Sequence, residues 1–416
     1  MNQTVAFWSA ALVPALGILG YWVLEYQRHR KRLRRFAVRI HVNGIRGKST
    51  VTRLIAAVLR EADIVTFAKT TGTAAKLIDA SGVDQPIFRR GAATILEQIG
   101  IIGDRVAPNS EGLVIECMAL RPQYQAIAES MIVQSNIGVI TNIREDHQDV
   151  MGETLPEIAN SLLSTCPRKG ALVTAEQDPE LQQIMQEHAE RMGSTLVLAD
   201  PGWVTDEDIA RFPYIAFRDN VAIGLAIAFM LGVPRARAIS AMVNAPPDPG
   251  VLRLMQREIG GKLVTWANLF AVNDRESAIV ATEMVRAHVD AETAVLGILN
   301  NRADRERRAV QFADIASHDI QFDYVATMGA LEKIVVERLL ENGYKPERVI
   351  RLGEHHHPTV EVMLRRLVVD LPAPRVLLVG LVNIHTHAAE MLTSYLESVG
   401  DFENASVLEE DQLRVA

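Results

Sequence analysis

HVNGIRGKST, residues 41–50, joins an apolar segment to an amphipathic one through two glycines. The preceding FAVRIHV (36–42) has the pattern of a buried strand, and the following VTRLIAAVLREA (51–62) has the spacing of an amphipathic helix. Glycines at such a corner expose backbone N–H groups, and the helix N-terminus adds partial positive charge. The turn therefore predicts an anion site, and an ordinary strand–turn–helix corner is the alternative.

The hexamer G-x-x-G-K-S at 44–49 indicates that the anion is a nucleotide phosphate. Lys48 would reach the outer phosphates, and the Ser49 hydroxyl would bind Mg²⁺. The longer P-loop pattern has a glycine where this chain has Val42, so the match is to the shorter form. The predicted phosphate-binding loop comprises Gly44, Ile45, Arg46, Gly47, Lys48, Ser49 and Thr50.

Residues 5–24, VAFWSAALVPALGILGYWVL, form a run of 20 residues without a charge. This length spans a bilayer core as a helix, and aromatic residues lie near both ends. Basic residues follow the run, so the positive-inside rule places the rest of the chain in the cytoplasm. The sequence predicts a single-pass anchor over 1–27 in the inner (plasma) membrane. A buried core helix is the alternative.

Charge is distributed unevenly between the start of the chain and the rest. The net charge is -8, but residues 1–35 carry six Lys or Arg against one Glu, so the remainder is strongly acidic. Nucleic-acid binding needs a broad basic surface, and the sequence predicts none. The two cysteines form neither a disulfide framework nor a metal-type pair, which fits a reducing compartment.

Helical and strand patterns alternate after the first helix, which is typical of α/β domains with a parallel sheet. NAPPDPG at 244–250 is the strongest Pro/Gly stretch and predicts a domain boundary. The expected parts are an anchor (1–27), an ATP-binding domain (28–250), a Rossmann-like domain (251–400) and an acidic tail (401–416). Expected strands lie at 37–42, 64–68, 112–117, 137–141, 171–174, 262–266, 293–298, 322–326 and 375–380. Expected helices lie at 48–61, 122–132, 154–165, 274–288, 304–315, 329–341 and 386–398.

Polar residues follow several of these strands at the carboxyl edge, where open α/β sheets bind ligands. Glu116 ends LVIECMAL as a candidate Mg²⁺ ligand, and His147 lies among carboxylates in VITNIREDHQD, which indicates a metal or phosphate role. Arg302 follows a strand in LNNRADRERR, for which a solvated helix start is the alternative. Asp274 in NLFAVNDRES is a candidate base for the incoming amine.

Taken in order, GIRGKS, TTGT (70–73), IECMAL, ITNIREDHQDVMGETLPEIANSL and NNRADRERR resemble the Mur ligase superfamily. HVNGIRGKST, KTTGTA, VIECMALRPQYQ and NLFAVNDRES are similar to one family within it, the CapB/PgsB ligase subunits of poly-γ-glutamate synthases. The likeness runs from about residue 36 to 390. It implies a P-loop, Mur-ligase-like central ATPase domain followed by a Rossmann-like α/β domain. AVNDRES departs from the Asp-x-x-His-Asn-Pro-type motif of Mur enzymes.

The resemblance also implies roles for individual residues. Lys48 would contact phosphate, Ser49 would bind Mg²⁺, and Glu116 and His147 would be metal ligands. Either Thr71 or Thr73 would lie beside the metal. The remaining assignments concern the nucleotide: adenine for Asn220, and phosphates for Arg253 and Arg302. Lys48, His147 and Arg302 are the expected catalytic residues, with ATP and Mg²⁺ as cofactors.

The activity implied by the resemblance is ATP-dependent, ADP-forming polymerisation of glutamate through an acyl phosphate on its γ-carboxylate. The implied partners are glutamate and the poly-γ-glutamate chain, the membrane, a small integral-membrane subunit and an export factor, and a homo-oligomer is expected. Two alternative functions remain open. One is folate polyglutamylation, and the other is a nucleotide-switched membrane scaffold that makes no bond.

Overall fold

The computed structural model divides the chain into two compact units, Met1–Pro249 and Gly250–Ala416. This division lies one residue from the boundary expected at 250. Within residues 3–14 the structure describes the backbone and the side chain of Leu12 alone. The described residues are 3–71, 75–89, 91, 93–248, 252–272, 274–353, 358–383 and 386–398.

An eight-stranded sheet forms the centre of the first unit, in the order β4-β3-β2-β5-β1-β6-β7-β8. The strands from β2 to β8 in this order pair in parallel, whereas β3 pairs antiparallel with both β2 and β4. The strands are β1 (Val38–Asn43), β2 (Thr66–Lys69), β3 (Lys76–Ile78), β4 (Asp84–Pro86), β5 (Gly112–Glu116), β6 (Ile137–Ile140), β7 (Ala171–Thr174) and β8 (Thr195–Leu198).

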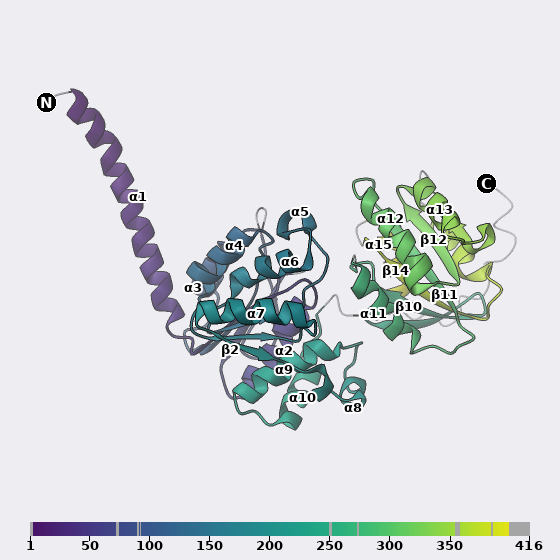
Figure 1. Cartoon of the computed structure of the whole chain (residues 1–416), viewed down its shortest axis with the longest axis horizontal. Helices are drawn as coiled ribbons and strands as arrows, with labels where there is room; N and C mark the ends of the chain where they lie inside the picture. The colour runs from purple at the N-terminus through teal and green to yellow at the C-terminus, as the bar shows by residue number, and fades with distance from the viewer. Residues whose placement is uncertain are drawn as a thin grey trace. The chain divides into compact units, whose positions relative to one another are not determined.

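Helices cover both faces of this sheet, as in a doubly wound α/β domain (Figure 1). α9 is buried along almost its whole length and packs with α10 against α2. The helices of this unit are α1 (Gln3–Leu33), α2 (Lys48–Glu61), α3 (Glu97–Asp104), α4 (Pro122–Ile127), η1 (Ala128–Val133), α5 (Gln148–Met151), α6 (Leu155–Leu162), η2 (Leu163–Thr165), α7 (Pro179–Met192), η3 (Pro201–Trp203), α8 (Asp206–Ala210), α9 (Arg218–Met230) and α10 (Arg235–Val243).

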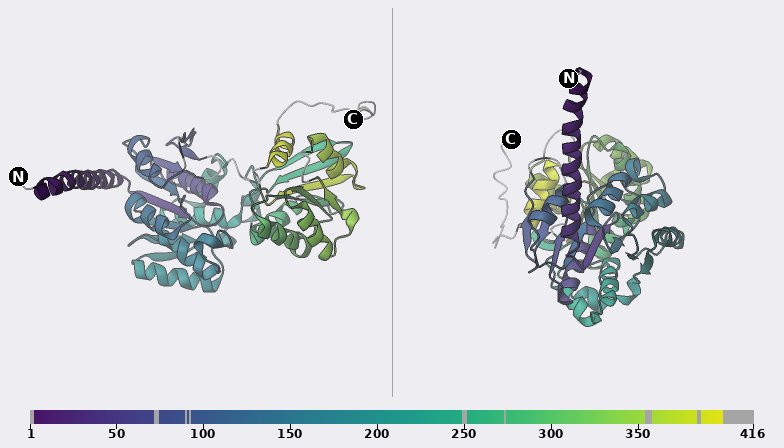
Figure 2. Two further views of the ribbon diagram at one scale, coloured as in Figure 1. Left: turned by 90° about the horizontal axis from the view of Figure 1, so that it is seen from above. Right: turned by 90° about the vertical axis from the view of Figure 1, so that its left-hand side faces the viewer.

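The first helix, α1, packs on its unit through its C-terminal end. Leu33 is buried, and Nε2 of His29 lies 2.7 Å from the carbonyl oxygen of Ile132 in η1. Two views of the chain show the rest of α1 extending away from the sheet of this unit (Figure 2). Among the residues that the structure describes, no helix is both long and apolar enough to cross a bilayer. The structure therefore does not confirm the expected transmembrane anchor, whose first half has side chains outside the described set.

The second unit contains a six-stranded sheet in the order β13-β12-β11-β14-β10-β9. All neighbours pair in parallel except β9, which is antiparallel to β10. Its strands are β9 (Leu254–Ile259), β10 (Lys262–Asn268), β11 (Ala294–Asn301), β12 (Tyr324–Gly329), β13 (Val349–Arg351) and β14 (Arg375–Leu381). Its helices are α11 (Arg275–Arg286), α12 (Glu306–Asp314), η4 (Ile315–Ile320), α13 (Glu332–Glu341), η5 (Pro346–Arg348), α14 (Val360–Leu364), η6 (Arg365–Val369) and α15 (His387–Glu397).

Candidate active site

The loop at 44–49 leaves β1 and enters α2 through two glycines with positive φ, 126° at Gly44 and 77° at Gly47. A Cβ atom at Gly44 would overlap the Thr141 hydroxyl, and one at Gly47 would lie 2.7 Å from Oδ1 of Asn220. Both positions therefore require glycine, for backbone conformation and for space. The loop ends on the N-terminus of a helix, so its N–H groups and partial positive charge favour an anion.

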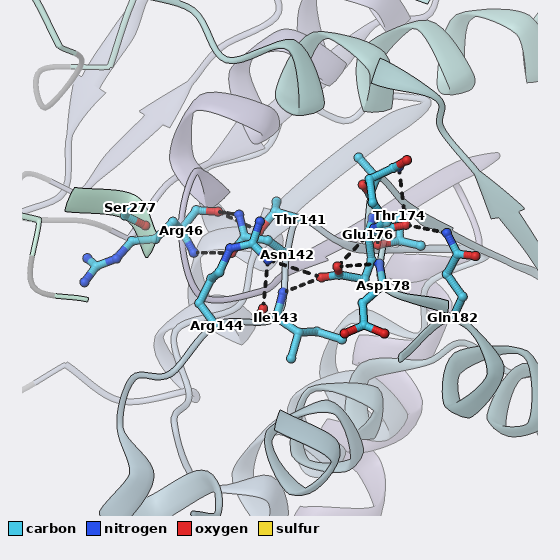
Figure 3. A network of polar contacts seen from close by, with 12 residues as sticks. Arg46, Thr141, Asn142, Ile143, Arg144, Thr174, Glu176, Asp178, Gln182 and Ser277 are labelled. Atoms are coloured by element: carbon cyan, nitrogen blue, oxygen red, sulfur yellow. Dashed lines mark hydrogen bonds and ion pairs between the residues drawn. The ribbon is translucent and has the colours of Figure 1, made fainter. Parts of the chain in front are cut away.

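Residues that follow β6 hold this loop in place (Figure 3). The backbone N–H of Arg46 donates to Oδ1 of Asn142 at 3.0 Å, and Nδ2 of Asn142 donates to the Arg46 carbonyl at 3.1 Å. The Thr141 hydroxyl donates to the same carbonyl at 2.6 Å. This role of Thr141 was not predicted, because a contact across about 95 positions has no local pattern in the sequence. The one feature of the sequence that could have indicated Thr141 was its position just after a buried strand.

Lys48 folds its side chain back over the loop. Its Nζ donates to the Gly44 carbonyl at 2.7 Å and to the Ile45 carbonyl at 3.1 Å. Burial lowers the pKa of Lys48, and the nearby Glu116 carboxylate partly opposes this shift. A cation beside a loop of N–H donors suits phosphate oxygens, and the phosphate contact of this lysine stays a prediction.

Glu116, the last residue of β5, connects the loop to the segment after β2. Its Oε2 accepts hydrogen bonds from the Ser49 hydroxyl at 2.8 Å and from the backbone N–H of Thr71 at 2.7 Å. A hydroxyl and a carboxylate in contact form a hard oxygen donor set, which fits Mg²⁺ bound together with water and nucleotide phosphates. The alternative hydroxyl, Thr73, lies outside the described residues.

A metal site built from protein groups alone is not seen in the described part of the chain, where no three His, Cys, Asp or Glu side chains converge. This agrees with the chemistry of Mg²⁺, which commonly uses one or two protein ligands and takes the others from phosphates and water. The donor set at Ser49 and Glu116 is therefore sufficient for a phosphate-bridged ion.

His147 lies beside the same loop and has a left-handed backbone, with φ of 52°. Its Nε2 is 3.6 Å from Oδ2 of Asp146, and the same oxygen accepts from Nη2 of Arg46 at 3.2 Å. Burial lowers the pKa of His147, Asp146 opposes this shift, and the charges of Lys48 and Arg46 lower the pKa further. The imidazole is consequently neutral at pH 7, the form that binds metal ions.

A buried carboxylate that sequence reasoning missed, Glu176, supports this region from the end of β7 (Figure 3). Its Oε2 accepts from the backbone N–H of Ile143 at 3.2 Å, and its Oε1 accepts from the N–H of Gln177 at 3.0 Å. Arg144 lies 3.6 Å from it. Glu176 thus orders the segment that carries Asn142 and His147. Glu176 comes two residues after a buried strand, and this position was the one feature of the sequence that could have indicated it.

Asn220 lies near the start of α9 and is 7% exposed. The space beside Gly47 is filled by its amide, so the structure places this residue against the phosphate loop. The expected contact with adenine stays a prediction.

Three residues of the second unit were expected to act in the site, and each lies in a different part of that unit. Arg253 is exposed just before β9. Arg302 follows β11 and donates to both carboxylate oxygens of Asp304, at 3.0 and 2.9 Å. Asp274 caps α11 by accepting from the N–H of Ser277 at 2.9 Å. This capping role gives a structural reason for Asp274 and does not support its assignment as a base.

Comparison with known proteins identifies both units. Residues 42–200 match the Mur ligase middle domain, and residues 254–399 match the poly-gamma-glutamate synthase CapB C-terminal domain. The chain is 39% identical over 314 residues to the capsule biosynthesis protein CapB of Bacillus anthracis, covering 75% of this chain and 67% of that protein. It is 35% identical over 354 residues to PGA synthase CapB of Bacillus subtilis (strain 168), covering 85% and 89%.

Among solved structures, E. coli FolC in complex with DHPP and ADP has a TM-score of 0.61. The match covers 88% of this chain and 91% of FolC at 14% identity, so it shows a shared fold alone. The two domain matches and the two curated relatives show more. The chain belongs to the CapB family of poly-γ-glutamate synthases and is an ATP-dependent amide ligase.

Proposed function

We propose that this chain polymerises glutamate by activating a γ-carboxylate with ATP, releasing ADP and joining the activated carbon to the amine of another glutamate. The relatives named PGA synthase CapB and capsule biosynthesis protein CapB support this substrate. The observation that carries the proposal is the contact of Glu116 with both Ser49 and Thr71 beside the Lys48 amine. This arrangement gathers a triphosphate-binding loop and a metal-type carboxylate at one sheet edge.

The chemistry follows from the poor electrophilicity of a carboxylate. Transfer of the γ-phosphoryl group to the γ-carboxylate gives an acyl phosphate, which the amine then attacks with loss of phosphate. Mg²⁺ held by Ser49 and Glu116 would neutralise charge on the phosphate oxygens. Lys48 would stabilise the same charge from the loop, and the protein would act mainly by positioning and electrostatics.

Other residues complete the proposed site. His147, neutral at pH 7, would bind a second ion or a phosphate oxygen near Arg46. Thr71 would orient Glu116 through its backbone N–H, which leaves its hydroxyl available to the metal shell. Arg253 and Arg302 keep their predicted roles as phosphate contacts, and no general base is assigned.

The membrane location is also a proposal. It is supported by the 20 uncharged residues at 5–24 and by the exposed apolar side chains of the described part of α1, among them Leu16, Ile18, Leu19 and Trp22. The basic residues after them favour a single-pass anchor in the plasma membrane with both units in the cytoplasm. Such a chain would work next to a small integral-membrane subunit and an export factor, and as a homo-oligomer.

Product analysis tests the proposal. Full-length protein in membrane vesicles, given ATP, Mg²⁺ and glutamate, should release ADP and phosphate only when glutamate is present, together with a γ-linked product. AMP and pyrophosphate would contradict acyl-phosphate chemistry. A parallel reaction with a reduced folate and glutamate should give no product, and ATP turnover without any new amide bond would instead support a nucleotide-switched scaffold.

A further inference from the structure

An open pocket of about 370 Å³ lies in the first unit, outside the 44–49 loop. It is lined by one side of α3 and by the segment before it. Phe88 and Arg89 come from that segment, and Glu97 and Arg105 mark the two ends of the α3 side. None of these residues belongs to the proposed phosphate or metal site.

The pocket begins close to the proposed active site. Oε1 of Glu97 lies 3.0 Å from Nζ of Lys69, the last residue of β2. Lys69 pairs in register with Ile115, the residue before Glu116. Thr71, two positions after Lys69, donates its N–H to Glu116. Lys69 therefore contacts the pocket through Glu97 and lies on the strand next to the one that ends in Glu116, whose charge acts on it.

Arg89 is the cation that faces this end of the pocket. Its Nε donates to Oε2 of Glu97 at 2.6 Å, and its Nη2 donates to Oε1 at 3.0 Å. Lys69 pairs with the same carboxylate from a fully buried position, where burial lowers its pKa. Arg89 is partly exposed, and its contacts with Glu97 use two of its five N–H donors. The remaining donors can bind a carboxylate ligand.

Phe88 adds an apolar surface beside this charge. Its side chain is 87% exposed, unusually high for a large aromatic residue. A γ-linked glutamate chain presents both features along its length, since each residue has one free α-carboxylate and a stretch of methylene groups. The side of α3 from Glu97 to Asp104 is about 10 Å long at 1.5 Å per residue, enough for a short stretch of such a chain.

We propose that this pocket is the subsite for the donor, where Arg89 binds an α-carboxylate of γ-linked glutamate and Phe88 packs on its methylene groups. The terminal γ-carboxylate then points toward Ser49 and Glu116 for phosphorylation. This inference rests on the proposed function and deepens it, because it assigns the part of the first unit that selects a polyanionic chain.

The test compares KM values in full-length protein supplied with a γ-linked oligoglutamate as donor. Phe88→Ala and Arg89→Ala should each raise the KM for the oligoglutamate about tenfold, and Arg89→Lys should restore part of the loss because lysine keeps the charge without the planar fork. The KM for ATP should stay unchanged. Arg191→Ala, on the exposed side of α7, is the matched control and should behave as wild type.

Two results would overturn the inference. One is an unchanged oligoglutamate KM in Phe88→Ala. The other is a result in which Phe88→Ala and Arg89→Ala no longer bind anionic lipid vesicles but keep the wild-type KM for the oligoglutamate. That result would make the pocket a membrane contact. If wild type itself shows no glutamate-dependent ADP release, the proposed function fails instead, so the two failures are distinguishable.

Discussion

At the scale of single residues, the site depends on one carboxylate. Glu116 is 2% exposed and accepts from Ser49 and Thr71, and a glutamine at this position could accept the same two hydrogen bonds. Its charge acts on the buried Lys48 amine and would act on a bound metal ion.

Glu116→Gln should therefore lower kcat about 10²- to 10³-fold, as expected for loss of one contact to developing charge. The glutamine carbonyl still accepts both hydrogen bonds, so the unfolding temperature should stay close to that of wild type. Glu111→Gln, an exposed change just before the same strand, is the control. An active Glu116→Gln enzyme at ordinary Mg²⁺ concentration would exclude the assigned metal ligand.

A buried ion pair beneath the loop makes a second residue-scale prediction. Nδ1 of His41 lies 2.8 Å from Oε2 of Glu129, and both residues are buried. Burial alone would lower the pKa of His41, but the neighbouring Cys117 and the hydrogen-bonded Glu129 outweigh it and raise the pKa to about 9. A raised pKa stabilises the fold fully below the unfolded value near 6.5, and this contribution is lost as pH rises through about 9.

Glu129→Gln should thus destabilise the first unit by about 3 to 5 kcal/mol, because it leaves His41 without its buried partner. Urea unfolding at several pH values measures this. The difference between wild type and variant should be largest below about pH 6.5 and should shrink as pH rises toward about 9. A difference that stays constant across this range would show that His41 does not titrate with the assigned partner.

At the scale of elements, the start of α2 fixes the geometry of the phosphate loop. Gly47 is the left-handed residue before the helix, and the Asn220 amide lies against it. Gly47→Ala should cost about 1 to 2 kcal/mol of stability from backbone conformation and should also raise the KM for ATP by displacing Asn220. Gly232→Ala is matched to it, since φ is 71° and no atom lies within 4 Å. Equal ATP affinity in the two variants would contradict this role.

Several long periodic elements were predicted from the sequence, although the 14-residue helix α7 was not, and short strands were missed. α2 was expected at 48–61 and is found there, because its apolar spacing and its Gly47 start are local. β3 and β4 were missed, since three residues carry too little pattern. β9 was missed because it is a half-exposed edge strand without a continuous apolar run.

In the candidate site, too, some residues could be predicted from the sequence and others could not. Lys48, Ser49 and Glu116 were identified because a loop motif and a strand end mark them in the sequence. Glu176 and the clamp by Thr141 were not, since their partners lie far along the chain or are backbone groups. Arg53 shows the limit most clearly: it is 2% exposed in α2 and binds Asp84 at 2.7 Å, a buried ion pair that helical spacing does not indicate.

At the scale of the whole molecule, the apolar run in α1 predicts that the enzyme works at a membrane. Removing residues 2–27 deletes the apolar run but keeps His29 and Leu33, which pack on the first unit. The truncated protein should leave the membrane fraction after carbonate extraction, retain its unfolding temperature and still bind ATP. A full-length chain that carbonate extracts as readily as the truncated one would argue against the anchor.

The central claim is that the 44–49 loop delivers a phosphoryl group to a glutamate carboxylate, and glutamate-dependent ADP release by Lys48→Ala tests it most directly. Lys333→Ala, at a lysine in the second unit whose side chain is 83% exposed, is the control. ADP release should fall at least 10²-fold in Lys48→Ala and stay near wild type in the control, and both variants should remain folded. Near-normal ADP release by a folded Lys48→Ala protein would contradict the account.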